Sequence, residues 1–161
     1  MLLDLENAPV PEVGATAPDF TLRSANGHDV TLSSYRTQKP VLLAFFPLAF
    51  TSTCTAEMCA FNEDFDAFAA TGVKILPISV DSTASLREYR AKYNLGVDLL
   101  SDFRRTTSAA YGVLLEDKFY SKRAYFLIDT DGIVRWAHVE EQTRDRRDNA
   151  EILRRIRELL D

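Results

Sequence analysis

Apolar positions in this chain follow two different periods, and the segments in which each period holds predict the elements. Residues 40–46 (PVLLAFF) and 73–80 (VKILPISV) are almost continuously apolar, which is typical of strands covered on both faces. Residues 19–32 instead alternate apolar and polar positions on either side of Asn26-Gly27, which predicts an N-terminal β-hairpin. We therefore expect a sheet with a buried centre and a hairpin at its edge.

Helical periodicity appears between and after these strands. Residues 54–70 place four large apolar side chains on one stripe, namely Met58, Phe61, Phe65 and Phe68. Residues 86–93 predict a second helix, which Asp81 or Ser82 can cap at its N-terminus. The segment 146–160 predicts an amphipathic helix whose inward positions are Ile152, Leu153, Ile156 and Leu160.

The remaining segments are shorter and complete the predicted order of elements. A short element is expected around 97–103 and a brief helix around 106–112, and 123–129 with 133–140 form another hairpin. Strands that alternate with helices indicate an α/β fold with a mixed central sheet flanked by helices. We expect one domain over residues 13–161, preceded by a loosely held arm over 1–12.

Composition agrees with this picture and narrows the classes of function. The chain has 161 residues, with 46% hydrophobic and 27% charged residues, which is ordinary for a globular domain. A net charge of −5 argues against nucleic acid or an anionic membrane as the main partner. The longest apolar stretch, residues 41–50, is about half the length of a membrane helix, and the N-terminus carries acids rather than the basic residues of a signal peptide. A cytoplasmic protein is therefore expected.

The only two cysteines, Cys54 and Cys59, lie five positions apart at the start of the predicted helix. If that helix starts near Thr53, Cys54 falls on the apolar stripe and Cys59 lies about 140° away on the polar side. The unpaired N–H groups and the dipole of a first helical turn stabilise an anion, so Cys54 is placed to react as a thiolate. We therefore expect the two sulfurs to have different environments.

Other interpretations of the cysteines remain open on the residues alone. Cys54 can be a small buried apolar residue without chemistry. A zinc or copper site usually shows C-x₂₋₄-C with histidines nearby in sequence, whereas His28 and His138 are both distant, although the fold can bring one close. A disulfide reductase normally carries C-x-x-C, which is absent here. We expect neither a metal nor a cofactor.

Residues 45–54 (FFPLAFTSTC) resemble the peroxiredoxin signature P-x-x-x-[ST]-x-x-C, with Pro47, Thr51 and Cys54 at its fixed positions. Three further segments resemble the same family: VGATAPDFTL (13–22), PISVDS (77–82) and LLSDF (99–103). The similarity covers roughly residues 13–150 and looks most like the alkyl hydroperoxide reductase E type. It implies a thioredoxin-like fold, in agreement with the predicted order of elements.

The resemblance implies a thiol-dependent peroxidase that reduces hydrogen peroxide and organic hydroperoxides through a cysteine sulfenic acid. Cys54 would be the peroxidatic nucleophile, Thr51 would hydrogen-bond the thiolate and the peroxide oxygen, and Pro47 would shield the thiolate from water. Arg123 matches the arginine with which this family reaches the pocket from a distant strand. Glu57 resembles an acidic residue common after the peroxidatic cysteine; it either orients Arg123 or is only an anion favoured in a first helical turn.

Cys59 departs from the single-cysteine pattern of the E type and resembles the second cysteine of the Q-type (bacterioferritin comigratory) peroxiredoxins. An intramolecular Cys54–Cys59 disulfide, reduced by a thioredoxin-like protein, is then expected. Residues i and i+5 of an intact helix are roughly 8.6 Å apart at Cα, beyond the limit of about 7 Å for a disulfide, so the first helical turns must unwind. Alternatively, Cys59 is a bystander and a low-molecular-weight thiol resolves the sulfenic acid.

Two non-enzymatic hypotheses remain beside the peroxidase. One is a thioredoxin-fold metal carrier that uses Cys54, Cys59 and His138, and the other is a redox sensor whose oxidised state is read by a partner. Arg123 and Thr51 favour the peroxidase, because a soft-metal site has no use for a guanidinium. The resemblance also implies a homodimer formed near the active-site loops.

Overall fold

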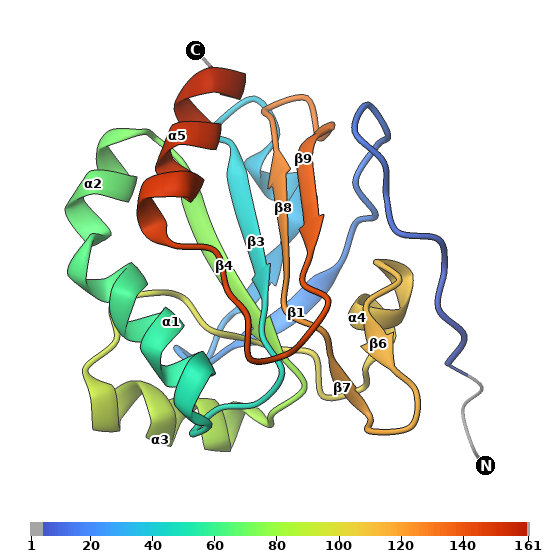
Figure 1. The fold of residues 1–161 in the computed structure, drawn as a ribbon, viewed down its shortest axis with the longest axis vertical. Helices are drawn as coiled ribbons and strands as arrows, with labels where there is room; N and C mark the ends of the chain where they lie inside the picture. The colour runs from blue at the N-terminus through green and yellow to red at the C-terminus, as the bar shows by residue number, and fades with distance from the viewer. Residues whose placement is uncertain (1–4, 161) are drawn as a thin grey trace.

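The computed structural model describes residues 5–160, in which a seven-stranded mixed sheet lies between two layers (Figure 1). The strand order is β2-β1-β5-β4-β3-β8-β9, and the three central strands β3, β4 and β5 are parallel while every other pair is antiparallel. The strands are β1 (Thr21–Ser24), β2 (Asp29–Thr31), β3 (Val41–Phe45), β4 (Lys74–Ser79), β5 (Leu100–Ser101), β8 (Ala124–Ile128) and β9 (Val134–Val139). This is the α/β fold with a mixed sheet that the sequence pattern predicts and the thioredoxin-like architecture that the resemblance implies, with both expected hairpins, β1–β2 and β8–β9, in place.

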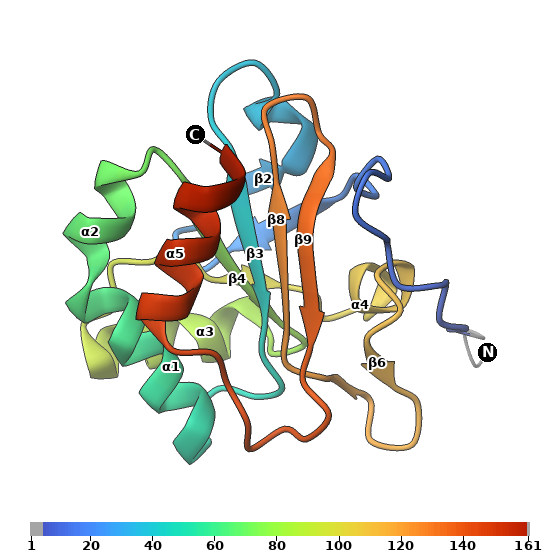
Figure 2. The ribbon, with the colours of Figure 1, turned by 45° about the horizontal axis from the view of Figure 1, so that its top comes forward.

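Four helices cover one face of the sheet (Figures 1 and 2). They are α1 (Ser52–Glu63), α2 (Phe65–Ala70), α3 (Thr83–Tyr93) and α5 (Asn149–Leu160). The other side carries the 3₁₀ helix η1 (Leu32–Tyr35), the short helix α4 (Thr106–Ala110) and a small hairpin of β6 (Leu114–Leu115) and β7 (Tyr120–Ser121). The strands β6 and β7 were not predicted. Ser82 caps α3 as expected and accepts a hydrogen bond from the Ser85 N–H.

Strict alternation along β3 divides the interior into two cores. Leu42 and Ala44 point to the face covered by α1, α2, α3 and α5, while Leu43 and Phe45 point to the opposite face. All five residues of β3 are buried, which explains why the sequence shows a continuous apolar run rather than alternation. Cys54 belongs to the first of these two cores.

The predicted helix over 54–70 is wrong in its continuity. The chain breaks at Asp64 into α1 and α2, and Phe65 is 46% exposed although Met58, Phe61 and Phe68 are buried. Asn149 fixes the break, because its side-chain amide donates both to the Ala60 carbonyl and to the Asp64 carboxylate, each at 2.8 Å. A single apolar stripe cannot continue across a break in helical phase.

The last helix begins three residues later than its period predicts. Asp148 caps α5, since its carboxylate accepts a hydrogen bond from the Glu151 N–H at 2.8 Å. Residues 140–148 form an irregular loop instead, which joins β9 to α5 (Figure 1) and whose Thr143 and Asp145 carbonyls accept hydrogen bonds from Arg123. Ile152, Leu153 and Ile156 are buried as expected.

Residues 5–12 form no helix or strand, and hydrogen bonds hold Asn7 and Ala8 of this predicted arm against the domain; residues 1–4 lie outside the described part of the chain. The Asn7 side chain exchanges two hydrogen bonds with the Leu114 backbone, at 2.7 and 3.0 Å, and the Ala8 N–H donates to the Ala109 carbonyl at 2.9 Å. Gly112, at φ 70°, permits this approach, because a Cβ there would lie 2.5 Å from the Ala8 carbonyl oxygen. The division into an arm and one domain at residue 13 stays a prediction.

Candidate active site

The segment that carries Cys54 begins where the central strand β3 ends. The chain turns through residues 47–50, with Phe50 in the left-handed region at φ 68°, and Thr51 takes the extended N-cap position of α1. Cys54 therefore lies in the first turn of α1, where it is 1% exposed. Its sulfur lies near the unpaired N–H groups of a helix start and is almost fully removed from water.

The neighbouring strand brings Arg123 to the same place. β8 pairs antiparallel with β3 in a register that sets Ala124 opposite Phe45, so Arg123 precedes β8 at the edge where β3 ends. Although Arg123 and Cys54 are 69 positions apart in the sequence, they come into direct contact. Arg123 is also only 1% exposed.

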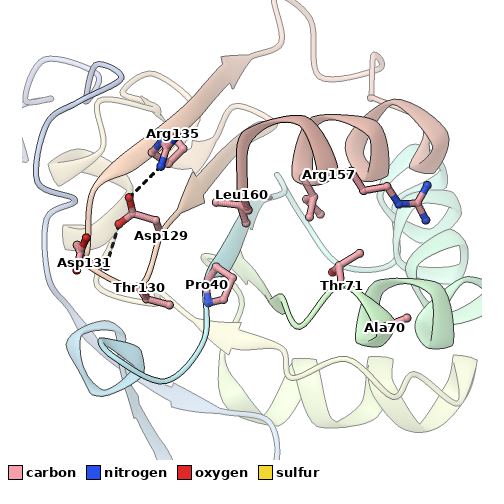
Figure 3. Close-up of a pocket in the computed structure, with 10 residues that line it drawn as sticks. Pro40, Ala70, Thr71, Asp129, Thr130, Asp131, Arg135, Arg157 and Leu160 are labelled. Carbon is pink, nitrogen blue, oxygen red and sulfur yellow. Dashed lines mark hydrogen bonds and ion pairs between the residues drawn. The ribbon is translucent and has the colours of Figure 1, made fainter.

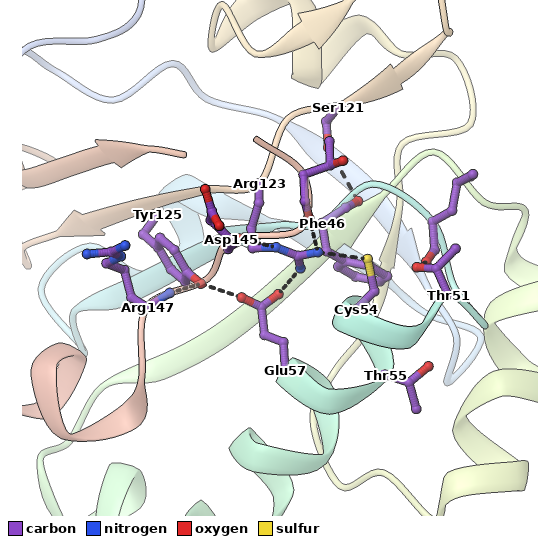
Figure 4. Close-up of polar contacts among 12 residues, drawn as sticks. Phe46, Thr51, Cys54, Thr55, Glu57, Ser121, Arg123, Tyr125, Asp145 and Arg147 are labelled. Atoms are coloured by element: carbon purple, nitrogen blue, oxygen red, sulfur yellow. Dashed lines mark hydrogen bonds and ion pairs between the residues drawn. The ribbon is translucent and has the colours of Figure 1, made fainter. Parts of the chain in front are cut away.

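The guanidinium of Arg123 is held by four partners. Figure 4 shows it between Cys54 and Glu57. Its Nη2 donates to Cys54 Sγ at 3.1 Å and to the Thr143 carbonyl at 2.9 Å. Its Nη1 donates to Glu57 Oε1 at 2.8 Å, and its Nε to the Asp145 carbonyl at 2.9 Å. Because the guanidinium is a rigid planar fork, these contacts fix its orientation toward the sulfur. The interpretation of Glu57 as a partner of Arg123 therefore agrees with the observed geometry.

The electrostatic balance keeps this guanidinium charged. Burial lowers the pKa of Arg123, but the adjacent Glu57 and Cys54 outweigh burial, so its pKa is raised above the ordinary value. Burial raises the pKa of Glu57, and the charge of Arg123 and a hydrogen bond from the Tyr125 hydroxyl oppose that shift. A permanent cation thus faces the Cys54 sulfur in a water-poor environment, where charge interactions are strong.

A pocket of about 190 Å³ opens onto Cys54. Its lining includes Pro47, Thr51, Arg123 and Leu48, together with three residues not expected at the site: Tyr120, Thr143 and Arg144. The Thr51 hydroxyl donates to the Leu48 carbonyl at 2.7 Å, so its proton is not directed at the sulfur. The expected hydrogen bond from this hydroxyl to the sulfur is therefore not made in this conformation, although Thr51 does line the pocket.

Cys59 lies on the same helix, one and a half turns beyond Cys54, and both are free thiols. The predicted polar environment of Cys59 is wrong, because the residue is half-buried and packs against the same core as Cys54. Tyr89 of α3 packs in the same core, and its hydroxyl donates to the Thr55 hydroxyl of α1 at 3.1 Å. The helix between the two sulfurs is intact.

The sequence profile of the AhpC/TSA family matches residues 13–137, which include this whole strand–helix junction and Arg123. The chain belongs to the AhpC/TSA family of peroxiredoxins. It is therefore a thiol-dependent peroxidase, an oxidoreductase.

Individual peroxiredoxins support the same assignment. Alkyl hydroperoxide reductase E of Mycobacterium tuberculosis is 40% identical over 139 residues, which cover 84% of this chain and 91% of the relative. The putative peroxiredoxin bcp of Coxiella burnetii is 36% identical over 129 residues, covering 76% of this chain and 85% of the relative. Among solved structures, peroxidoxin BcpB from M. tuberculosis has a TM-score of 0.83 at 30% identity and covers 94% of this chain and 99% of that one. Similarity to both the E type and the bcp/Q type agrees with the mixed pattern expected from the sequence.

Several residues of this peroxiredoxin site carry no signal in the sequence. The carbonyls of Thr143 and Asp145 hold Arg123 through the backbone, to which any residue type contributes alike. Tyr125 was expected only as a strand residue, yet its hydroxyl donates to Glu57. The single available signal is its position two residues after Arg123, which places both side chains on one face of an extended segment.

The described residues contain no cluster of side chains that would support the metal-carrier hypothesis. Across residues 5–160, no group of three or more His, Cys, Asp or Glu side chains could hold a metal ion. His138 pairs with Glu140 at 3.2 Å and His28 with Asp98 at 3.5 Å. The contact next to Cys54 is instead a guanidinium, which cannot ligate a metal.

A second, larger pocket of about 580 Å³ lies at the opposite ends of β3 and β8 (Figure 3). Pro40 precedes β3 there and Asp129 follows β8, and Leu160 closes the pocket from α5. Asp129 accepts hydrogen bonds from the backbone of its own turn and pairs with Arg135 at 3.4 Å, so its charge is already used structurally. Neither cysteine lines this pocket.

In residues 5–160, no helix is long and apolar enough to cross a membrane.

Proposed function

We propose that the thiolate of Cys54 attacks the terminal oxygen of a hydroperoxide. An S–O bond forms while the O–O bond breaks, and the departing oxygen takes a proton and leaves as water or an alcohol. The sulfur loses two electrons to become a sulfenic acid, and the peroxide is reduced. The observation that carries this proposal is the contact of 3.1 Å between Arg123 Nη2 and a sulfur held in the first turn of α1.

Ionisation of the thiol alone is too small an effect for peroxidase activity. Since a free thiol is a few per cent ionised near neutral pH, complete ionisation gains at most about 30-fold, and a less basic thiolate is also a weaker nucleophile. The larger contribution must come from groups complementary to the charge that develops along the breaking O–O bond. We assign this role to Arg123 and to the N–H groups at the start of α1, and to Thr51, which lines the pocket, once its hydroxyl turns from the Leu48 carbonyl to the substrate.

The pocket supports hydrogen peroxide and organic hydroperoxides as substrates. Its volume of about 190 Å³ exceeds what hydrogen peroxide needs, and Leu48 and Tyr120 give it an apolar side that suits an alkyl group. In this proposal Pro47 limits the access of water to the thiolate, and Glu57 holds Arg123 in place.

The site of oxidation tests this mechanism directly. The Cys59→Ser variant, treated with one equivalent of hydrogen peroxide, should gain the mass of one oxygen, and peptide mapping should place that oxygen on Cys54. Alkylation of Cys54 before treatment is the control and should abolish the gain. An oxygen on a methionine instead, with Cys54 still alkylatable, would contradict the mechanism.

Thr51 gives a smaller, separate prediction. Thr51→Val should lower the second-order rate of Cys54 oxidation by up to about tenfold, the value of one hydrogen bond to the reacting oxygens. Thr51→Ser keeps the hydroxyl and should react at nearly the wild-type rate in the same stopped-flow measurement. Equal rates for the valine and serine variants would show that the hydroxyl takes no part.

We further propose that Cys59 resolves the sulfenic acid by forming an intramolecular disulfide with Cys54. Its sulfur attacks Cys54, water leaves, and the first turns of α1 must unwind to allow the bond. Wild-type protein treated with one equivalent of peroxide should then lose the mass of two hydrogens. A persistent added oxygen would instead assign resolution to an external low-molecular-weight thiol.

The remaining partners belong to the same proposal. A thioredoxin-like protein is the proposed reductant of the disulfide, and a cytoplasmic location suits two free thiols. We also propose a homodimer formed near the active-site loops, supported by Phe50, Phe103 and Phe119, which are about half exposed or more. Analytical ultracentrifugation of the reduced protein tests the dimer.

A further inference from the structure

The hydroxyl of Tyr125, a residue of β8, makes hydrogen bonds to two other segments around the site (Figure 4). It donates to Glu57 Oε2 on α1, and it accepts a hydrogen bond at 3.0 Å from the Arg147 N–H in the loop before α5. Tyr125 itself belongs to β8 and is fully buried. One buried hydroxyl therefore connects the helix of the cysteines, the strand that follows Arg123, and the loop whose carbonyls hold Arg123.

Glu57 links these contacts to the opening of α1, because it lies between Cys54 and Cys59 on that helix. Its two carboxylate oxygens are both occupied, Oε1 by Arg123 and Oε2 by Tyr125. If the first turns of α1 unwind, the Glu57 carboxylate must leave both partners, and Arg123 is left as a buried charge without its carboxylate, which is costly. The same contacts that orient Arg123 therefore oppose the opening of the helix.

We propose that Tyr125 is a positioning residue that holds Glu57 in place, so that it keeps Arg123 aligned for peroxide reduction and keeps the Cys54 segment of α1 closed. This inference rests on the proposed function of Cys54. It predicts opposite effects on two steps: loss of the hydroxyl slows oxidation of Cys54 and speeds every process that requires α1 to open.

Tyr125→Phe isolates the hydroxyl because the ring keeps its packing. The Tyr125 ring stacks on Trp136 with centroids 5.9 Å apart and an interplanar angle of 18°, a contact that phenylalanine can retain. Tyr111→Phe is the matched control, since Tyr111 is equally buried and its hydroxyl donates at 2.7 Å to the Pro18 carbonyl. Tyr111 lies in the other core, away from Cys54.

Hydrogen exchange on the reduced protein measures opening without any peroxide chemistry. In Tyr125→Phe, the amides of residues 55–58 should exchange at least about tenfold faster than in wild type, the size expected for a lost hydrogen bond to a charged group. Amides of β3 (Val41–Phe45) report global unfolding and should change less than those of residues 55–58. In Tyr111→Phe, residues 55–58 should change no more than β3 does. Unchanged exchange at 55–58, or an equal increase in β3, overturns the proposal.

Stopped-flow oxidation supplies the second measurement. In the Cys59→Ser background, Tyr125→Phe should lower the rate of Cys54 oxidation by at least about threefold, because a misplaced guanidinium stabilises the transition state less well. A rate equal to that of the parent overturns the positioning role. If Cys54 is not oxidised even in the parent, the proposed peroxidase mechanism fails, while the exchange result still decides whether Tyr125 holds α1 closed.

Discussion

Replacing Cys54 with serine is expected to abolish peroxide consumption, with a loss of at least about a thousandfold, as is typical when a catalytic nucleophile is removed. The serine hydroxyl fits the same buried position beside Arg123, but it stays protonated near neutral pH and so is a poor nucleophile. The measurement is hydrogen peroxide consumption with excess dithiothreitol as reductant, so that neither Cys59 nor a protein reductant limits turnover.

The same substitution at Cys59 is the control for this experiment. Cys59→Ser makes the same replacement of sulfur by oxygen elsewhere on α1, and with an external dithiol present this variant should retain most of the activity. Circular dichroism of both variants should match wild type. Peroxide consumption by Cys54→Ser at a rate near that of wild type would falsify the assignment of Cys54 as the nucleophile.

The fold was largely predictable because burial leaves a clear pattern in the sequence. The continuous apolar run of residues 40–46 marks a strand covered on both faces, and in the structure β3 lies inside the sheet, between β4 and β8, with all five residues buried. The break at Asp64 was not predictable from periodicity. It depends on the Asn149 side chain, which is 85 positions away in the sequence.

The site was only partly predictable, because some of its residues act through their side chains and others only through their backbone carbonyls. Cys54 carries a chemical signal in its own sequence context, at a strand-to-helix junction. Arg123 by itself is only a charge before a strand, and the family resemblance singled it out; the register of β3 against β8 then explains how it reaches the sulfur. The carbonyls of Thr143 and Asp145 depend on the path of a loop, which side-chain types do not encode.

The predicted environment of Cys59 failed for a related reason. A helical wheel places Cys59 on the polar side of α1, but this position predicts exposure to solvent only if a single face of the helix is covered. The helix instead contacts the sheet on one side and Tyr89 of α3 on another, where the Tyr89 hydroxyl donates to Thr55 at 3.1 Å, so a wider part of its circumference is buried. Unwinding α1 therefore disrupts more packing than the sequence suggests. This packing and the contacts of Glu57 together oppose the unwinding that a Cys54–Cys59 disulfide requires.

Arg123→Ala should have the second-largest effect and should change rate and stability together. The rate of Cys54 oxidation should fall by about 10²–10³, as for removal of one preorganised donor to a transition state. The free energy of unfolding should also fall by about 3–5 kcal/mol, because Glu57 stays buried without its cationic partner. Stopped-flow oxidation and urea denaturation measure the two effects, and Lys122→Ala, a change at the adjacent half-buried cation, should alter neither strongly.

A double variant separates the two roles of the guanidinium. In Arg123→Ala/Glu57→Gln, the buried negative charge is gone, so much of the lost stability should return, while the sulfur still lacks its cation and oxidation should stay slow. The comparison depends on the geometry in which Arg123 contacts Cys54 and Glu57 through different nitrogens, Nη2 and Nη1. If the double variant regained the rate along with the stability, the slow oxidation of Arg123→Ala would be a consequence of misfolding, and Arg123 would have no direct part in peroxide reduction.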